Sequence, residues 1–234
     1  LKLGDSVKSS STADWDSHLS VASTDWSLSD VLDATIVAGL DDSNTRKQCK
    51  AVNGRIRVCN ALYGFNGWLG LAQIWISGNH IYQGIAKMND SYMDNPKFIT
   101  PYETPAWRQF VMCQEIGHPF GLDHQDVTFD NPNLGSCMDY TDDPDGPPSN
   151  LHPNQHDYDQ LAAIYAHPDG NNTFTQPTRF AAPKASADND EDLGTPTEKR
   201  DGKGRVILFE KDLGGGKKKF TWVKWSDWNP SDAK

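Results

Sequence analysis

Residues 113–124 read Cys-Gln-Glu-Ile-Gly-His-Pro-Phe-Gly-Leu-Asp-His, and their spacing is that of a metal site begun on a helix. Residues four apart share a helix face, so Gln114 and His118 are expected to point the same way, with Glu115 beside them. Gly121 can take the left-handed conformation that turns the chain and returns His124 as a third ligand. The pattern is therefore Gln-Glu-x-x-His-x-x-Gly-x-x-His.

With His in place of Gln114, this pattern would be the long zinc-binding signature of the metzincin metalloproteases, and the chain resembles that clan. A Gln side chain reaches about as far as a His ring, and its carbonyl oxygen can coordinate a metal. A neutral amide oxygen is a poorer zinc ligand than imidazole, so weaker metal retention is expected. Pro119 is a second departure, because it removes the backbone donor for the Glu115 carbonyl in the last helical turn.

Residues 136–140, Ser-Cys-Met-Asp-Tyr, resemble the tight Met-containing turn that underlies the metal in metzincins. By this resemblance Met138 would pack under the ligands and take no part in the chemistry. Tyr140 matches the position of the tyrosine that, in astacin-like and serralysin-like members, can swing from the metal to stabilise the tetrahedral oxyanion. The resemblance spans roughly Trp15 to His167 and does not cover the C-terminal tail.

The resemblance implies a secreted zinc-dependent endopeptidase. Gln114, His118 and His124 would hold Zn²⁺, and Glu115 would accept the proton of the attacking water and pass it to the leaving amine. The alternative is a catalytically inactive metzincin-fold binding protein with a weakened metal site. Chelator-sensitive cleavage that is lost in Glu115→Ala would separate the two hypotheses.

Composition narrows the set of partners. The chain has 234 residues and a formal net charge of -10, which argues against nucleic acid because phosphate binding needs a basic face. No apolar run approaches the length of a membrane span. A monomer acting on a protein or peptide substrate is expected. Five acidic loop residues could bind calcium as a second cofactor, or they could simply form a solvated acidic surface. They are Asp126, Asp130, Asp142, Asp143 and Asp145.

The four cysteines favour two disulfides over a metal cluster, because no Cys-x-x-Cys pair is present. Cys49 and Cys59 flank an Asn-Gly hairpin signal at 53–54, so they could close across neighbouring strands. A bond between Cys113 and Cys137 would join the site helix to the loop beneath it. Disulfides indicate an oxidising compartment, and a start without Met or an apolar signal segment is typical of a mature secreted fragment. Four reduced thiols in a cytosolic protein are the alternative.

The expected fold class is α+β, a metzincin-like domain with a twisted mixed β-sheet, a central site helix, a Met-turn and a C-terminal helix. This domain would cover residues 1–178. Residues 179–205 are rich in charged residues, Pro and Gly, and are expected to be a flexible linker or long loop. Residues 206–234 would form a β-hairpin extension, too small to be stable alone and therefore docked on the main domain or on a partner. Its tryptophans would either pack on the main domain or form a carbohydrate or partner surface; these are Trp222, Trp225 and Trp228.

Apolar periodicity predicts the individual elements. Residues 1–12 are expected to be a loose end, and Thr104 with Pro105 is expected to begin the site helix. In metzincins an edge strand ahead of the site helix lines the cleft, where substrate adds as a further strand. By resemblance, 71–76 or 80–89 would be that edge. The predicted helices are 14–26 and 153–165, and the predicted strands are 31–38, 55–59, 71–76, 80–89, 206–209 and 220–225.

Overall fold

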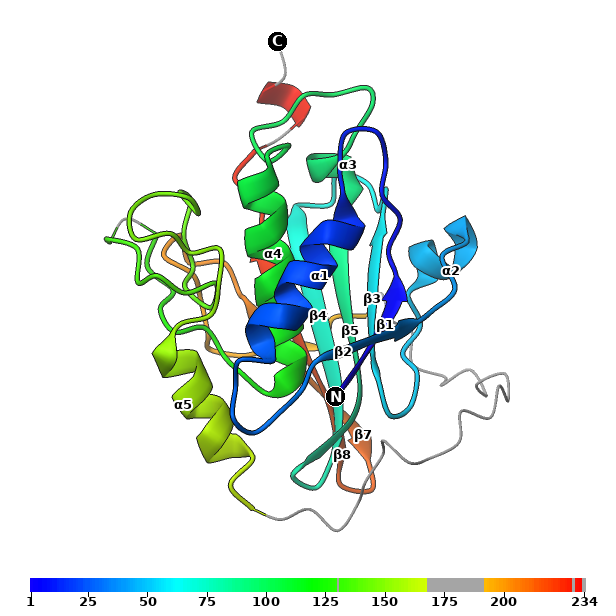
Figure 1. The fold of residues 1–234 in the computed structure, drawn as a ribbon, viewed down its shortest axis with the longest axis vertical. Helices are drawn as coiled ribbons and strands as arrows, with labels where there is room; N and C mark the ends of the chain where they lie inside the picture. Colours follow the sequence, from blue (N-terminus) through cyan, green and yellow to red (C-terminus); the bar gives the residue numbers. More distant parts are fainter. Residues whose placement is uncertain (130, 168–191, 229, 233–234) are drawn as a thin grey trace.

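The computed structural model describes residues 1–129, 131–167, 192–228 and 230–232. These residues form a mixed α+β fold on an eight-stranded sheet with the strand order β2-β1-β3-β5-β4-β8-β7-β6 (Figure 1). The α+β class expected from the sequence is confirmed. The strands are β1 (Lys2–Ser6), β2 (Thr35–Ala38), β3 (Ile56–Ala61), β4 (Trp68–Ser77), β5 (His80–Asn89), β6 (Thr195–Pro196), β7 (Leu208–Gly214) and β8 (Lys217–Trp225).

The sheet is parallel at one end and antiparallel at the other. Strand β1 pairs in parallel with β2 and β3, and β3 pairs in parallel with β5. Strand β4 is antiparallel to both β5 and β8, and β7 is antiparallel to β8. The change of direction between β5 and β4 is made by the tight turn at Gly78, which has a positive φ of 60°. Strand β4 therefore borders the C-terminal hairpin.

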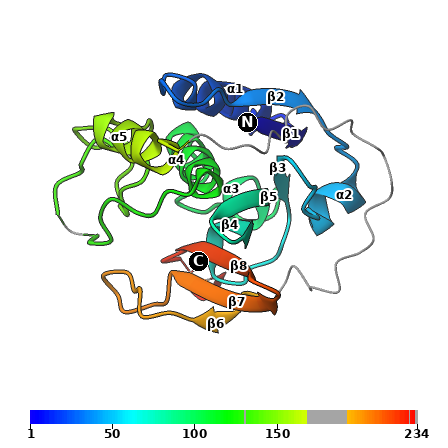
Figure 2. The ribbon, with the colours of Figure 1, turned by 90° about the horizontal axis from the view of Figure 1, so that it is seen from below.

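The helices lie on both sides of this sheet. Viewed from below, the strands follow one another in an arc, with α4 and α5 on one side and α2 on the other (Figure 2). Helix α4 packs against α1, β4 and β5, which places the site helix at the centre of the molecule. The helices are α1 (Trp15–Trp26), α2 (Ser43–Gln48), α3 (Asp90–Met93), α4 (Pro105–Gly117) and α5 (Gln155–Ile164), with 3₁₀ turns at His118–Phe120 and Pro230–Asp232.

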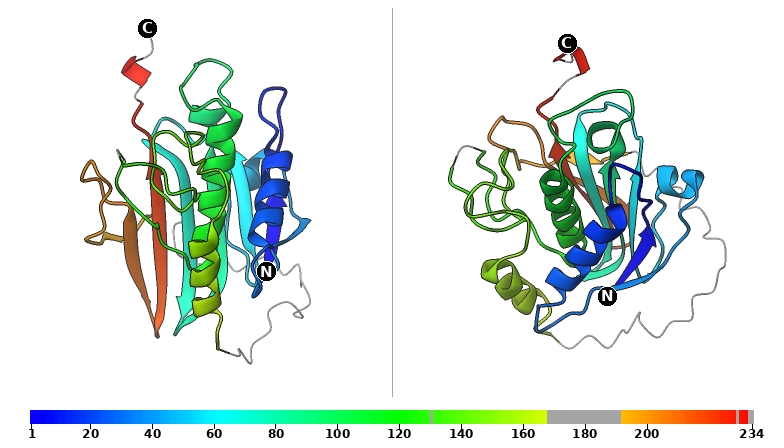
Figure 3. Two further views of the ribbon diagram at one scale, coloured as in Figure 1. Left: turned by 60° about the vertical axis from the view of Figure 1, so that its left-hand side comes forward. Right: turned by 45° about the horizontal axis from the view of Figure 1, so that its top comes forward.

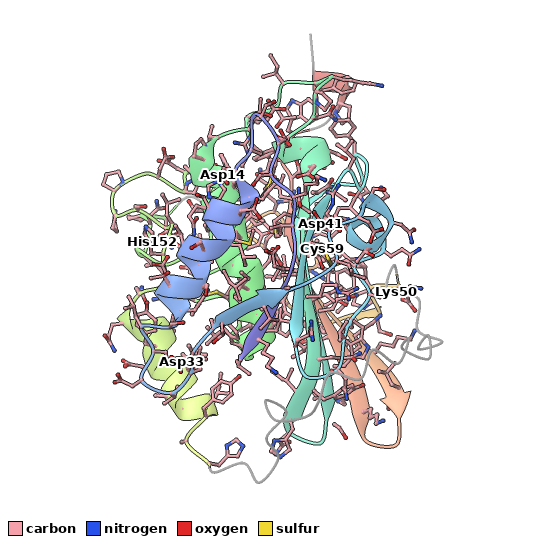
Figure 4. All side chains as sticks on the ribbon, turned by 45° about the vertical axis from the view of Figure 1, so that its right-hand side comes forward. Asp14, Asp33, Asp41, Lys50, Cys59 and His152 are labelled. Atoms are coloured by element: carbon pink, nitrogen blue, oxygen red, sulfur yellow. A yellow bond between two sulfur atoms is a disulfide. The ribbon has the colours of Figure 1, made fainter. Side chains whose placement is uncertain are left out.

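Two helix starts follow the local sequence. Asp14 caps α1 by accepting the backbone N–H of Ser17 (Figure 4). Thr104 caps α4 by accepting the backbone N–H of Trp107, and Pro105 is the first residue of that helix, as predicted. From Arg108 to Gly117 every residue of α4 is buried. A polar residue in this stretch must therefore find its partners inside the protein.

The prediction for residues 1–12 is wrong. Residues 2–6 form β1, which lies between β2 and β3 rather than at a loose end. Leu3 is fully buried in the main apolar core, and the backbone of β1 hydrogen-bonds to strands on both sides. The pairing with distant strands supplies the order that the Ser-rich local sequence does not indicate.

The prediction of a strand over 31–38 is too long, since β2 holds only Thr35–Ala38. The chain after it begins the short helix α2, whose N-cap is Asp42. Both predicted disulfides are confirmed, Cys49–Cys59 and Cys113–Cys137. The expected hairpin between the first pair is wrong, because Cys49 ends α2 in a left-handed conformation instead of lying in a strand beside Cys59.

The expected C-terminal hairpin is formed by β7 and β8, and it docks on the main sheet through the pairing of β8 with β4. In Figure 3 the orange and red strands lie at one edge of the sheet, next to the cyan strand. The part of the predicted linker from 179 to 191 lies outside the described residues. Within residues 192–205, β6 pairs with β7 at the edge of the sheet, and Gly202 N–H donates to the Val127 carbonyl. Within the described ranges, no helix is long and apolar enough to span a membrane.

Asp90 is a buried carboxylic acid at the start of α3, away from the predicted site. Trp15 Nε1 donates to its Oδ1 at 2.9 Å, and Asn60 Nδ2 donates to its Oδ2 at 2.8 Å. Burial, followed by the negative charge of Asp94, raises the pKa of Asp90 from 3.8 to about 7. The folded protein therefore binds a proton at Asp90 that the unfolded chain releases near pH 4.

The stability of the fold should accordingly fall as pH rises towards 7. A carboxyl group whose pKa is raised on folding stabilises below its unfolded pKa, and this contribution is lost as pH passes the folded pKa. Between pH 5 and pH 7 the loss attributable to Asp90 is about 2 kcal/mol. Urea unfolding of the natural chain and of Asp90→Asn at both pH values measures it, because the amide cannot ionise. A pH dependence equal in the two proteins would show that Asp90 titrates normally.

Candidate active site

The site is built on the last turn of α4. Gln114 and Glu115 are the tenth and eleventh residues of this helix, and His118 follows with helical dihedral angles, its N–H donating to the Gln114 carbonyl. Pro119 is accommodated because the chain changes there to a 3₁₀ turn over His118–Phe120. Gln114 and His118 thus stand one turn apart on the same face of the helix.

The turn after the helix brings the second histidine back to the first. Gly121 has φ of 98°, and its N–H donates to the His118 carbonyl at 2.8 Å, so the left-handed turn predicted there is confirmed. The imidazole rings of His118 and His124 lie 4.6 Å apart between centroids, at an interplanar angle of 80°. Two predicted ligands therefore meet within the site.

Gln114 is oriented by the turn at residues 136–140, named the Met-turn after Met138. Its Nε2 donates to the carbonyl oxygens of Cys137 at 2.9 Å and of Asp139 at 3.0 Å. Two acceptors fix which end of the amide is the nitrogen. The remaining atom, Oε1, is buried without a hydrogen-bond partner. Gln114 thus presents a carbonyl oxygen, the group expected of it as a metal ligand.

Both histidines are held in the neutral form. His118 Nδ1 lies 2.9 Å from the Leu122 carbonyl, which can only accept, so Nδ1 carries the proton and Nε2 has the free lone pair. Burial lowers the pKa of His118 to about 3. Burial, then the charges of His118 and Lys224, holds the pKa of His124 well below 6.5. Neutral imidazole is the form that binds metal ions.

Glu115 is fully buried, and neither of its oxygens has a hydrogen-bond partner. Gly70 of β4 makes room for it, since a Cβ there would lie 2.4 Å from Glu115 Oε1. Burial raises the pKa of Glu115 well above 4.5, and the positive charge of Lys224 acts in the opposite direction. In the pairing of β4 with β8, Gly70 lies opposite Lys224. This pairing explains why the Lys224 charge acts on the Glu115 carboxylate.

Two residues of the Met-turn, Met138 and Tyr140, pack against the end of α4 and against His124. A Cβ on Gly117 would lie 2.5 Å from Met138 Sδ, so Met138 packs directly against the end of α4. Tyr140 is fully buried, with its ring 5.1 Å from that of His124. Its hydroxyl accepts the backbone N–H of Trp225 at 2.9 Å. The tyrosine is thus beside the predicted ligands, but its hydroxyl is bound to the C-terminal hairpin.

These residues fit a metal ion in their donor set. Buried atoms without hydrogen-bond partners include Gln114 Oε1, both Glu115 oxygens and both ring nitrogens of His124, although Asp123 Oδ1 lies 3.8 Å from His124 Nδ1. Buried polar atoms without a partner are costly unless a ligand satisfies them. Among the described residues no group of three or more His, Cys, Asp or Glu is placed to hold a metal. The donors available at this site are the Gln114 oxygen and the two imidazole rings.

His18 and His152 have partners away from this site. His18 Nδ1 contacts Gln109 Oε1 at 3.0 Å, and His152 Nδ1 contacts Asp25 Oδ2 at 2.6 Å, with His152 on the surface (Figure 4). Of the acidic residues considered for calcium, Asp126 binds the backbone of Thr128 and the side chain of Asn131. Asp130 lies outside the described residues.

Sequence reasoning missed the residues that cover the site. The Trp222 ring stacks on His118, with centroids 5.0 Å apart and planes 10° apart. Lys224 is 2% exposed, and its Nζ lies 3.6 Å from the centre of the Tyr140 ring. The alternation of side chains along a strand places Trp222 and Lys224 on the same face of β8, and this much could be read from the sequence. Nothing in the local sequence indicated which surface that face would meet.

Comparison with models of known protein families gives no match, and comparison with curated proteins gives none either.

Proposed function

We propose that this protein is a secreted zinc-dependent endopeptidase with a metzincin-like fold. The observation that carries the proposal is the group of buried atoms without partners on Gln114, Glu115 and His124, next to the oriented neutral ring of His118. Metal-assisted peptide hydrolysis needs three protein ligands that leave one position of the metal open, with a carboxylate nearby as the base; here the ligands would be one amide oxygen and two imidazoles. The two disulfides agree with an oxidising compartment.

The proposed mechanism assigns one task to each side chain. Gln114, His118 and His124 would hold Zn²⁺, which supplies a Lewis acid when bound. Glu115 takes a proton from the attacking water and gives it to the leaving nitrogen. Tyr140 would donate a hydrogen bond to the developing oxyanion once its hydroxyl is released from Trp225.

The second candidate is a catalytically inactive binding protein with the same fold. One observation favours it: the side chains of the site are closed off from solvent, with Gln114 and Glu115 at 0% and His118 at 1% exposed. An inactive protein has no need of an open cleft. The two candidates differ in whether the site binds zinc and in whether any form of the protein cleaves peptides.

Zinc content of the natural chain and of Gln114→His is the test of the proposal. Both proteins are purified without added metal and dialysed against metal-free buffer, and zinc per chain is measured by mass spectrometry. We expect near-stoichiometric zinc in both, with tighter retention in Gln114→His because imidazole is the better zinc ligand. His118→Ala is the matched control and should lose the metal.

Zinc in the Gln114→His protein alone would mean that the natural site retains too little metal for catalysis. The binding-protein candidate would then replace the peptidase. Equal zinc in the natural chain and in His118→Ala would show that any bound metal lies somewhere other than this site.

A further inference from the structure

We propose that the β7–β8 hairpin inhibits the enzyme by covering its site. Strand β8 pairs with the edge of β4, in the position that a peptide substrate would take. This inference rests on the proposed peptidase function and adds a means of regulation to it. Extended peptides bind to sheet-edge strands by adding a further strand, and β4 packs against the site helix together with β5. In the structure that edge is already paired.

The pairing of β8 with β4 is long and antiparallel. It runs from Trp68 opposite Trp225 to Ser77 opposite Lys217, along the whole of β4. The other side of β4 pairs with β5, so β4 would keep a neighbouring strand if β8 were removed. The hairpin therefore occupies the substrate edge without being the sole support of β4.

Trp222 covers the first histidine. Its indole lies flat on the His118 ring, and its Nε1 donates to Asp123 Oδ1 at 3.3 Å. Lys199, in the segment leading to β7, pairs with the same Asp123 carboxylate. These contacts hold the hairpin against the turn that carries His124.

Two further residues of β8 contact Tyr140 and its neighbour Thr141. The backbone N–H of Trp225 donates to the Tyr140 hydroxyl oxygen and so holds this side chain against β8. Lys224 Nζ donates to the Thr141 carbonyl at 2.9 Å and lies over the Tyr140 ring, on the strand position paired with Gly70. Lys224 is also close enough for its charge to act on Glu115, although neither Glu115 oxygen has a hydrogen-bond partner.

The covered site cannot admit a polypeptide, because Gln114, Glu115 and His118 are each at most 1% exposed. Cleavage requires the face of β8 that carries Trp222 and Lys224 to move away. The hairpin is consequently expected to hold the protein in a latent form with low basal activity.

Val223→Asp tests whether lifting the hairpin releases activity. Val223 is fully buried on the opposite face of β8 from Trp222, in an apolar cluster with Trp68 and Leu71. A carboxylate there opposes docking without changing a side chain of the site. We expect cleavage of an unstructured fluorogenic peptide to rise about tenfold or more, a conservative expectation for opening a mostly closed state. Val223→Ala is the matched control and should stay close to the natural rate.

Hydrogen exchange measured by mass spectrometry gives a readout that is independent of activity. In Val223→Asp, exchange should rise in residues 217–225 and remain slow in α4 and β5. This pattern shows that the hairpin has lifted from a folded protein. Fast exchange throughout the chain would mean unfolding, and the cross-link described next would then decide the question in the natural background.

Ser77→Cys with Lys217→Cys provides a reversible lock. Gly78 N–H donates to the Gly216 carbonyl, so the neighbouring pair of Ser77 and Lys217 is a non-hydrogen-bonded pair, where a disulfide fits across strands. Both positions are exposed, whereas the natural cysteines are fully buried, so mild reduction should open the engineered bond selectively. Oxidation should lower cleavage below the basal rate, and reduction should restore it.

The outcomes separate the cover from the peptidase. Cleavage that rises with hairpin release and falls with the lock supports the cover. Equal cleavage in the locked and released forms overturns the cover and leaves the peptidase intact. A released hairpin with no cleavage in any form refutes the peptidase itself, and the inhibitory role with it.

Discussion

Glu115→Gln is expected to lower kcat/KM for peptide cleavage by about 10²–10⁴-fold, the contribution typical of a positioned general acid–base group. The change keeps the shape of the side chain and the packing against Gly70, but an amide can neither accept the proton of the attacking water nor return it to the amine. Rates are best compared in the Val223→Asp background, in which the site is expected to be uncovered.

The matched control is Glu103→Gln, the same chemical change just before α4 and outside the site. It should leave the rate unchanged. Zinc content should stay equal in both variants, because Glu115 is not among the proposed ligands. Cleavage that survives in Glu115→Gln at the natural rate would assign the proton transfer to another group.

Removing the Cys113–Cys137 disulfide by Cys113→Ala with Cys137→Ala should lower the free energy of unfolding by about 3 kcal/mol. The bond joins α4 to the Met-turn across 24 positions. The same turn supplies the two carbonyls that orient Gln114, one of them from Cys137 itself. Loosening it should also lower zinc affinity by about 10–100-fold, the usual effect of losing an outer-shell partner. Urea unfolding and zinc titration measure the two effects.

Cys49→Ala with Cys59→Ala is the control for this prediction. That disulfide joins the end of α2 to β3 and lies apart from the site. Its loss should also destabilise the fold while leaving zinc affinity unchanged. An equal loss of zinc in both double variants would mean that the effect arises from general destabilisation rather than from the Met-turn.

The local geometry of the site could be predicted from the sequence because short-range rules determine it. Helical periodicity places Gln114 and His118 on one face, a Thr-Pro pair starts α4, and the glycine at 121 makes the left-handed turn that returns His124. Both disulfide pairings were predicted correctly, although the hairpin that suggested Cys49–Cys59 does not form, because Cys49 ends α2. Whether these residues bind zinc and hydrolyse peptides remains a proposal.

The larger arrangement could not be predicted, because it depends on contacts between distant segments. Strand β1 has only Leu3 as a large buried apolar residue, and its order comes from β2 and β3 on either side. The sequence predicts that Trp222 and Lys224 share one face of β8, but it does not predict which surface that face packs against. An orphaned buried acceptor such as Gln114 Oε1 also becomes visible only when the structure shows what surrounds it.

The pairing of β4 with β8 has a consequence for the order of events during biosynthesis. Gln73 Nε2 donates to Thr221 Oγ1 across 148 positions of the chain. At about 5–20 residues per second, the segment from the end of α5 to the end of β8 takes about 3–12 s to synthesise. Every residue of the proposed site has therefore been made before the strand that covers it exists. During this interval, β8 of the same molecule is not yet available to pair with the edge of β4.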